Sequence, residues 1–313
     1  MIELAVEQPV ASALPAQRGV RVTSTGVSPR PDFPSSPSAR EVAGAWSVLR
    51  ARQWSHFLLA PAIPLVAELS SDPLAAARAY LPAAGVAALC LGYAYGLNAI
   101  ADRHDDASAS KNPLVRVPHV PPAIAASVAA CAVAAVALAA LLPAVRVLPA
   151  MLSVSWGSLY SVGPRLKRLP LLSTLTNCGI FTPLAFLTGD VAHAPHFGLL
   201  LATFVTLQTQ AQLIHEVADR DEDFNAAVRS TAVAWGGATA LGAARALGVV
   251  VAVGFLVSGP WTVTRGLAMV TVGAAALVLR GAMPADAARL RIRHRRLALF
   301  LAALLFASAV LGA

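Results

Sequence analysis

Apolar runs of about 20 residues, separated by short polar segments, follow one another along most of this chain. Nine such runs cover residues 53–70, 80–101, 121–142, 145–161, 171–189, 196–217, 231–256, 262–280 and 296–312. Because an α-helix rises about 1.5 Å per residue, a run of this length is enough to cross the hydrocarbon core of a bilayer. The pattern predicts an all-α, polytopic integral membrane protein, with a nine-helix transmembrane bundle in residues 43–313.

The first 42 residues have a different character. Residues 1–42 are rich in Pro, Ser, Ala and Arg, show no apolar periodicity and contain no apolar stretch long enough for a signal peptide. We expect them to form a disordered cytosolic tail.

Composition excludes most soluble classes of protein. Apolar residues make up 57% of the chain and charged residues only 13%, about half the usual charged share of a soluble domain. The net charge of +8 does not indicate a nucleic-acid partner, because the basic residues lie beside apolar runs and form no soluble basic face. The three cysteines lie inside apolar runs without metal-ligand spacing and are interpreted as packing residues.

The distribution of basic residues predicts the orientation. All but four of the 24 lysines and arginines fall in the tail or in loops that nine spans would place on the same side; the exceptions are Arg78, Arg146, Arg245 and Arg265. Lys and Arg concentrate in cytosolic loops. The N-terminus and this set of loops are therefore predicted to be cytosolic, at the inner membrane if the protein is bacterial.

Acidic residues gather in two clusters at the cytosolic ends of the second and sixth runs. These hold half of the 16 acidic residues in the chain: Asp102, Asp105 and Asp106, and then Glu216, Asp219, Asp221, Glu222 and Asp223. A lipid-facing bundle has no structural use for such clusters, because acids are costly in a membrane and like charges repel. A bound cation would compensate both effects.

The spacing of the polar residues in the two clusters indicates which cation would bind. Asn98, Asp102 and Asp106 recur four residues apart, and Glu216, Asp219 and Asp223 recur three and four apart, so two continuous helices would present two stripes of oxygen ligands. Oxygen ligands suit Mg²⁺, which completes its coordination with water and substrate phosphate. A phosphorylated substrate is therefore predicted. Basic residues on the same side could hold the oxygens of a diphosphate; they are Arg103, Lys111, Arg165, Lys167, Arg220 and Arg229.

Four segments, in order, resemble motifs of the UbiA superfamily of membrane prenyltransferases. The segment 98–106 is similar to the family's NDxxDxxxD motif, with Ala99 where the family usually has Asp. The segment 219–223, followed by 229–233, resembles its DxxxD motif with a basic residue and Ser/Thr behind it. The segment 160–170 resembles the family's Tyr-to-Lys loop, and a weaker likeness is an Arg near a Trp at 50–54.

This resemblance implies a fold, a donor and a set of roles. It implies a bundle with a central cavity in which Mg²⁺ bridges the two acidic motifs and a prenyl diphosphate binds. Asp102, Asp106, Asp219 and Asp223 are then expected to contact the metal directly, with Asn98 and Glu216 as ligands through water or as orienting groups. The residues expected to bind the substrate are Lys167, Arg229, Arg52, Lys111, Tyr160 and Asn98. The chemistry is transfer of the prenyl group to an acceptor, aromatic or quinone-precursor acceptors being favoured.

Three other functions remain open from the sequence. A membrane terpene cyclase of the same superfamily needs the same diphosphate site and no acceptor. A secondary transporter also buries charges between helices, although transport sites tend to lie near the bilayer midplane. A nonenzymatic scaffold or lipid-binding protein would leave the paired acidic clusters unexplained.

Overall fold

Long helices run side by side through the part of the chain that the computed structural model describes, which is residues 45–312 except 107, 108, 110, 144, 189, 190, 192, 193 and 195. The predicted tail at 1–42 lies outside these residues. No strand occurs among them. The helical elements are α1 (Ala45–Leu49), α2 (Ala51–Trp54), η1 (Ser55–Leu65), α3 (Val66–Ser71), α4 (Pro73–Ala101), α5 (Pro122–Leu141), α6 (Val147–Ser161), η2 (Leu166–Arg168), α7 (Leu172–Phe181), η3 (Thr182–Phe186), α8 (Phe197–Ala218), α9 (Arg220–Asn225), α10 (Thr231–Trp235), α11 (Gly237–Val257), α12 (Val263–Val278), η4 (Pro284–Asp286) and α13 (Ala287–Val310).

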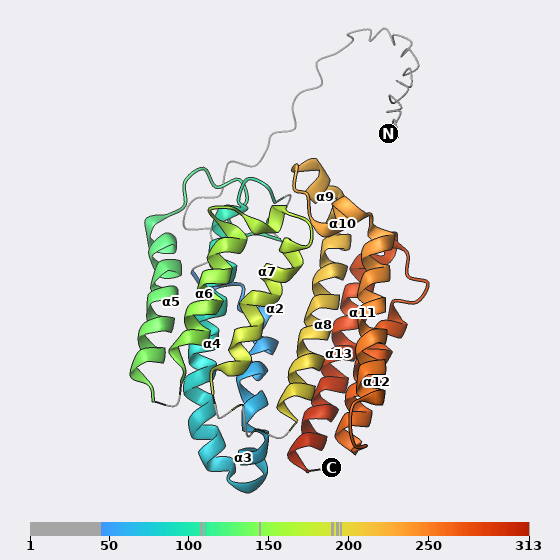
Figure 1. The fold of residues 1–313 in the computed structure, drawn as a ribbon. Coiled ribbons are helices and arrows are strands. Elements are labelled where there is room, and N and C mark those ends of the chain that lie inside the picture. The colour runs from blue at the N-terminus through green and yellow to red at the C-terminus, as the bar shows by residue number, and fades with distance from the viewer. Residues whose placement is uncertain are drawn as a thin grey trace, which may run out of the picture. The chain divides into compact units, whose positions relative to one another are not determined.

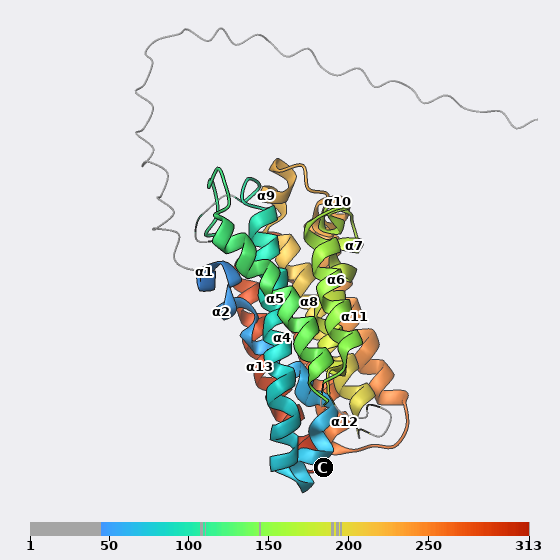
Figure 2. The ribbon, with the colours of Figure 1, turned by 90° about the vertical axis from the view of Figure 1, so that its left-hand side faces the viewer.

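The helices pack as two neighbouring groups. In the first, α4 packs against α5, α6 and η1, and α6 packs against α7. In the second, α11 packs against α8 and α12, and α13 packs against α8 and α12. Contacts of α7 and η1 with α8 join the groups (Figures 1 and 2). Small residues permit close approach: a Cβ on Gly157 of α6 would lie 3.1 Å from the Cβ of Ala94 on α4.

Within the described residues all nine expected runs consist mainly of helical backbone, but three are irregular. The run 231–256 is interrupted at Gly236, which has a φ of 82° and separates α10 from α11. Pro61 and Pro64 lie inside η1, where the missing N–H groups prevent regular α-helical bonding and the backbone takes the tighter 3₁₀ form. Likewise α7 ends at Phe181, two residues before Pro183, and continues as η3. The runs 53–70, 171–189 and 231–256 are thus helical with local interruptions at their prolines or at Gly236.

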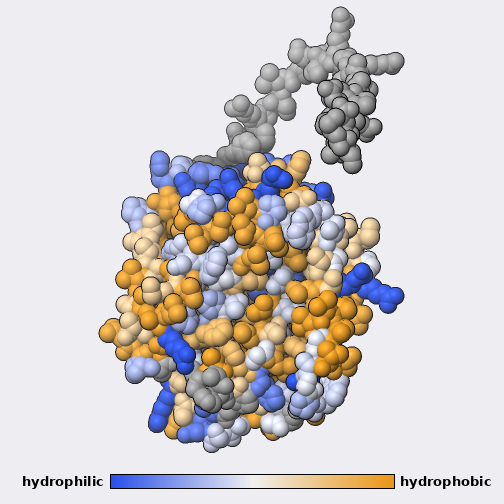
Figure 3. Space-filling view, viewed as in Figure 1, coloured by the Kyte–Doolittle hydropathy of each residue, from blue (hydrophilic) through white to orange (hydrophobic). Residues whose placement is uncertain are grey.

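Apolar side chains cover much of the outer surface. On α11 the exposed residues include Val249, Val250 and Val253, and on α6 they include Leu148 and Met151. Figure 3 shows hydrophobic residues across the middle of one face and hydrophilic residues mainly near its two ends. By length and hydropathy, four helices within the described residues could cross a membrane, namely α4, α5, α8 and α11, and α12 is apolar but shorter. The count of nine crossings stays a prediction.

Candidate active site

A polar cavity of about 390 Å³ lies where both acidic clusters meet. Its walls come from the C-terminal ends of α4 and α8, from α9, and from the loop after α6, all at one end of the bundle (Figure 1). Its acidic lining residues are Asp102, Asp105, Asp106, Glu216, Asp219, Glu222 and Asp223. Folding therefore brings together two clusters that lie more than a hundred residues apart in the sequence.

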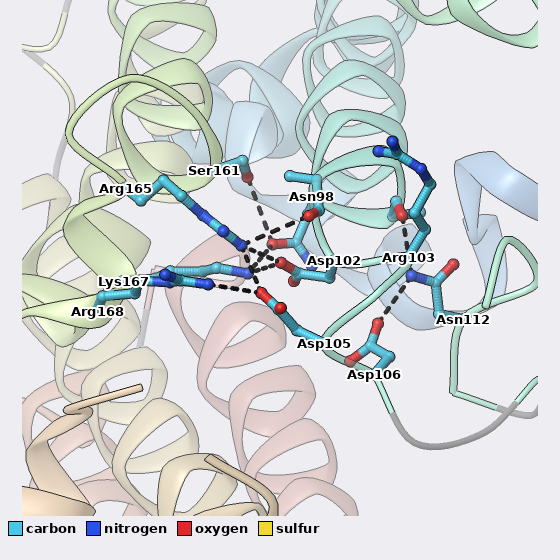
Figure 4. A network of polar contacts seen from close by, with 12 residues as sticks. Asn98, Asp102, Arg103, Asp105, Asp106, Asn112, Ser161, Arg165, Lys167 and Arg168 are labelled. Carbon is cyan, nitrogen blue, oxygen red and sulfur yellow. Dashed lines mark hydrogen bonds and ion pairs between the residues drawn. The ribbon is translucent and has the colours of Figure 1, made fainter. Parts of the chain in front are cut away.

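The first cluster is neutralised by the loop after α6. Arg165 donates hydrogen bonds to Asp102 at 2.9 Å and to Asp105 at 2.8 Å, and Arg168 donates to Asp105 at 2.8 Å. The ammonium of Lys167 also contacts Asp102, and Figure 4 shows the three basic side chains reaching toward the two carboxylates. Burial alone would raise the pKa of Asp105, but the hydrogen bonds from Arg165 and Arg168 outweigh it and hold that pKa below its ordinary value.

Asp106 has a different partner. The buried amide of Asn112 donates to Asp106 at 2.8 Å and to the carbonyl of Ala99 at 2.9 Å, tying the loop back to the end of α4 (Figure 4). The backbone N–H of Leu114 donates in turn to Asn112 Oδ1 at 2.9 Å. Burial, together with the nearby Asp102 carboxylate, raises the pKa of Asp106. The sequence interpretation did not identify Asn112.

Lys111 joins the two clusters. Its ammonium lies 3.0 Å from Asp219, 2.8 Å from Glu222 and 3.8 Å from Asp106. One positive side chain thus stands between carboxylates of both motifs. These carboxylates hold its pKa above the ordinary value, although burial acts in the opposite direction.

Glu216 is almost completely buried and accepts four hydrogen bonds. The donors are the hydroxyls of Ser173 and Thr174 on α7, the amide of Gln212 one turn earlier on α8, and the backbone N–H of Thr231 at the start of α10, at 2.8–3.1 Å. One carboxylate therefore links α7, α8 and α10 in the wall of the polar cavity. Residues 173 and 174 were not singled out from the sequence.

The donor set fits a magnesium ion. Carboxylate and amide oxygens line the cavity, and no thiolate does so. Among the described residues no three acidic, histidine or cysteine side chains form a ready-made metal cluster, because Lys111, Arg165 and Lys167 stand among the carboxylates. These three basic side chains balance the negative charge that Mg²⁺ would otherwise balance. When Mg²⁺ is bound, the same side chains could contact a diphosphate.

The predicted helical stripes are only partly correct. α4 ends at Ala101 and Asp102 is its C-cap, so Asp102 and Asp106 do not lie on a continuing helix. Acidic side chains are unfavourable at a helix C-terminus, and the carboxylates here face separate basic partners. On the other side Asp219 separates α8 from α9. In both clusters one helical hydrogen bond persists past the helix end, from the N–H of Asp106 to the carbonyl of Asp102 at 2.9 Å and from the N–H of Asp223 to the carbonyl of Asp219 at 2.8 Å.

The predicted substrate-binding residues divide into two sets. Asn98, Lys111, Tyr160 and Lys167 line the polar cavity, as do the four aspartates expected at the metal. Arg52 and Arg229 are exposed and do not line it. Arg165, which the sequence predicted as one of the basic residues near a diphosphate, also lines it, and further lining residues that the sequence did not assign a role are Arg50, Gln53, Ser230 and Arg291. Arg50 lies in the same Arg-to-Trp segment as Arg52. That segment was the signal in the sequence from which Arg50 could have been identified.

An apolar cavity of about 500 Å³ adjoins the polar one. It lies among η1, α4, α7, α8 and α13, with Phe57, Phe181, Phe204 and Phe306 in its walls. The two cavities share lining residues, which are Arg50, Gln53, Asn98, Tyr160, Gln212, His215 and Arg291. The arrangement can hold a phosphorylated head group beside the carboxylates and a long hydrocarbon chain beside the phenylalanines.

Known proteins resemble this chain in sequence and in fold. The model of the UbiA prenyltransferase family matches residues 58–308. No curated protein matches the sequence significantly.

Solved structures with the same fold include a UbiA homolog from Archaeoglobus fulgidus bound to GPP and Mg²⁺, at 18% identity and a TM-score of 0.62 over 85% of this chain and 99% of that chain. A structure of digeranylgeranylglyceryl phosphate synthase matches at 13% identity and a TM-score of 0.61, over 86% and 99% of the two chains. An apo UbiA homolog from Aeropyrum pernix K1 matches at 20% identity and a TM-score of 0.52, over 82% and 97%.

Proposed function

Because the chain belongs to the UbiA prenyltransferase family, we propose that it is a Mg²⁺-dependent integral membrane enzyme that moves a prenyl group from an isoprenyl diphosphate to an acceptor. The observation that carries this proposal is the polar cavity with both acidic clusters directly beside an apolar cavity, with shared lining residues. An amphiphilic donor needs both environments in contact. Solved relatives bound to DMAPP or GPP with Mg²⁺ support the choice of donor and metal.

Asp102, Asp106, Asp219 and Asp223 would hold the magnesium, with Asn98 beside them. When bound, the metal supplies Lewis-acid stabilisation of the charge that develops on the departing diphosphate. For Glu216 we favour a positioning role over a place among the ligands, since its oxygens already accept four hydrogen bonds.

Basic side chains of the polar cavity would hold the diphosphate. Lys111, Lys167 and Arg165 exchange their carboxylate partners for phosphate oxygens when the substrate enters, and Arg50 adds a fourth positive charge. Arg52 and Arg229 remain predictions for this role, and their exposed positions favour Arg50 in place of Arg52. Tyr160, at the junction of the cavities, is proposed as a hydrogen-bond donor.

The proposed reaction breaks one bond, forms one bond and releases one proton. The bond between C1 of the prenyl chain and the diphosphate oxygen breaks, and pyrophosphate leaves with the electron pair. C1 forms a new bond to the nucleophilic atom of the acceptor, which loses a proton that pyrophosphate can accept. The apolar walls keep water from the allylic cation in between.

The same proposal includes the arrangement in the membrane. We infer nine crossings, with the cavity end facing the cytosol, because the basic residues of the loops around the acidic clusters lie at that end. Cysteine labelling from either side of sealed vesicles tests this: a cysteine at His104 should react from the cytosolic side, and one at Gly259, between α11 and α12, from the other.

Pyrophosphate release tests the activity. Purified protein in nanodiscs would receive geranyl, farnesyl or geranylgeranyl diphosphate, with Mg²⁺ or with EDTA, and with or without a panel of acceptors. Mg²⁺-dependent release that needs an acceptor, with a prenylated product, is the expected result. Release without any acceptor, giving a cyclic hydrocarbon or alcohol, would indicate a terpene cyclase. A lack of release with every acceptor would overturn the proposed activity.

A further inference from the structure

A buried amide ties the loop after α4 to the end of that helix. Asn112 is 0% exposed, and its Nδ2 atom donates to the carbonyl of Ala99 at 2.9 Å and to Oδ2 of Asp106 at 2.8 Å. Its Oδ1 atom accepts from the backbone N–H of Leu114 at 2.9 Å. The last carbonyls of a helix have no partner within it, so the bond to Ala99 also completes the end of α4. Both sides of the amide are therefore in use.

Apolar packing holds Asn112 in this place. Five buried side chains from α1, α4, α5 and the loop form a small cluster, namely Val48, Ala99, Leu114, Val117 and Ile124. Leu114 lies two residues after Asn112, so the packing of the loop fixes where the amide stands. Ala99, where the family usually has Asp, does not line the polar cavity. Its side chain therefore belongs to the packing of the loop and not to the lining of the cavity.

Asp106 differs from the other acids of the first cluster in the charge of its partner. Asp102 and Asp105 accept hydrogen bonds from arginine and lysine side chains of the loop after α6. Asp106 instead accepts from the neutral amide of Asn112, and its ion pair with Lys111 spans 3.8 Å. A neutral donor orients a carboxylate without cancelling its charge. Asp106 therefore keeps a negative charge that an entering cation can use.

The two oxygens of Asp106 have separate surroundings. Oδ2 accepts from Asn112, whereas Oδ1 lies 3.8 Å from the ammonium of Lys111 (Figure 4 shows the amide reaching Asp106). Asp106 and Lys111 line the polar cavity and Asn112 does not, so the amide stands behind the carboxylate as seen from the cavity. Hydrogen bonds from such outer partners fix the orientation of metal-binding carboxylates, and their loss lowers metal affinity about 10- to 100-fold.

We propose that Asn112 is a positioning residue for the metal: its amide holds Asp106 with Oδ1 directed into the polar cavity, and thereby sets the affinity for Mg²⁺ without contacting the ion. This inference rests on the proposed function, in which Asp106 is a metal ligand. Lys111 directly precedes Asn112, so the same anchor also places the ammonium that reaches the second cluster. A merely structural tie would stabilise the loop without a specific link to Asp106.

Two substitutions remove the tie to different extents. Asn112→Ala removes all three hydrogen bonds. Asn112→Ser keeps a hydroxyl that can accept from the N–H of Leu114, but it is too short to reach Asp106 and the carbonyl of Ala99 together. The full-length protein in nanodiscs would be titrated with MgCl₂ at a fixed concentration of an unreactive farnesyl thiolodiphosphate. In both variants we expect the Mg²⁺ concentration for half-maximal binding to rise about 10- to 100-fold. Asn112→Ser carries the test if Asn112→Ala is too unstable to purify.

A double-mutant cycle separates positioning from a general loss of structure. In an Asp106→Ala background, Asn112→Ala should change the Mg²⁺ requirement by less than about twofold, because the carboxylate that it positions is gone. In an Asp223→Asn background it should keep its full effect, since the hydrogen bonds of Asn112 go to the first cluster and its loop. The matched control is His119→Asn, because His119 is exposed in the same loop and lines neither cavity. It should leave the Mg²⁺ requirement as in the wild type.

The outcomes distinguish this inference from the proposed function. A rise with Asn112→Ala or Asn112→Ser that disappears in the Asp106→Ala background supports the inference. An unchanged Mg²⁺ requirement in both variants, or an equal rise with and without Asp106, overturns it while the proposed function stands. A wild type that binds the thiolodiphosphate equally well in EDTA, or does not bind it at all, counts against the proposed function, and the inference then falls with it.

Discussion

The ammonium of Lys111 lies 3.0 Å from the carboxylate of Asp219, and it also reaches Glu222 and Asp106. A residue of the loop after α4 therefore holds together both acidic clusters from within the cavity that they line. Lys111 occupies a place between the motifs where a metal would also reduce the repulsion of the carboxylates. It can serve two states, as a counter-charge without substrate and as a phosphate ligand with substrate.

Replacing Lys111 should have opposite effects on the affinity for Mg²⁺ and on the affinity for the prenyl diphosphate. In Lys111→Gln the carboxylates lose a competing cation, so Mg²⁺ should bind the substrate-free protein more tightly, while prenyl diphosphate should bind more weakly. We expect each change to be about three- to tenfold. Calorimetry with MgCl₂ and with a thiolodiphosphate measures both affinities.

Arg220→Gln is the control for this prediction. Arg220 lies beside the second cluster, but its side chain is exposed and its nearest ion-pair partner is Asp221, at 4.0 Å. Equal effects of the two substitutions would show that general positive charge matters and that the bridging position of Lys111 does not.

Glu216 should matter more for the structure of the site than for metal binding. Glu216→Gln keeps the size of the side chain but replaces one acceptor oxygen by a donor, which cannot satisfy all of its four present donors. One buried unsatisfied group costs about 1–3 kcal/mol, so the variant should unfold at a lower temperature and have a reduced kcat. Thermal unfolding in nanodiscs and steady-state kinetics measure these effects.

The comparison variant for Glu216 is Asp219→Asn. If Glu216 is a positioning residue, its variant loses much less Mg²⁺ affinity than Asp219→Asn does. A fully stable Glu216→Gln protein with the same loss of Mg²⁺ affinity would instead place Glu216 among the ligands.

Acid should weaken magnesium binding. Burial, together with the neighbouring Asp219 carboxylate, raises the pKa of Asp223 from the ordinary 3.8 to about 6. The protonated acid cannot bind the metal, so Mg²⁺ affinity of the substrate-free protein should be full above this pKa and should fall as pH drops through it, by up to about tenfold per pH unit. Titrations between about pH 5 and pH 7.5 measure the slope, and Asp223→Asn should flatten it. A constant affinity across this range contradicts the assignment of Asp223.

The sequence was most informative where charge interrupts apolar helices. Acidic clusters at membrane-helix ends have few structural explanations, so Asp102 and Asp219 could be proposed as site residues before their neighbours were known, and both line the polar cavity. The basic residues of the loop after α6 followed from the same reasoning, and Arg165 and Lys167 do contact Asp102.

Side-chain direction was less predictable. Arg50 has a left-handed backbone conformation with φ of 55°, which interrupts the helix between α1 and α2 and changes which neighbouring residue faces the cavity. No helical periodicity reveals such a break, and the expectation for Arg52 rests only on the resemblance of the segment 50–54 to a family motif. The hydrogen bonds of Glu216 with Ser173 and Thr174 join residues more than 40 positions apart and depend on how α7 packs against α8.

The central claim is that the two acidic clusters act together, through magnesium, on a prenyl diphosphate. Equilibrium binding of an unreactive prenyl thiolodiphosphate in nanodiscs tests it directly, with Mg²⁺ or EDTA, in the wild type, Asp102→Asn and Asp219→Asn. The account predicts binding that needs Mg²⁺ and that falls about a hundredfold or more in either variant, since each variant removes a metal ligand from a different cluster. Binding that persists in EDTA, or that survives the loss of either aspartate unchanged, would contradict it.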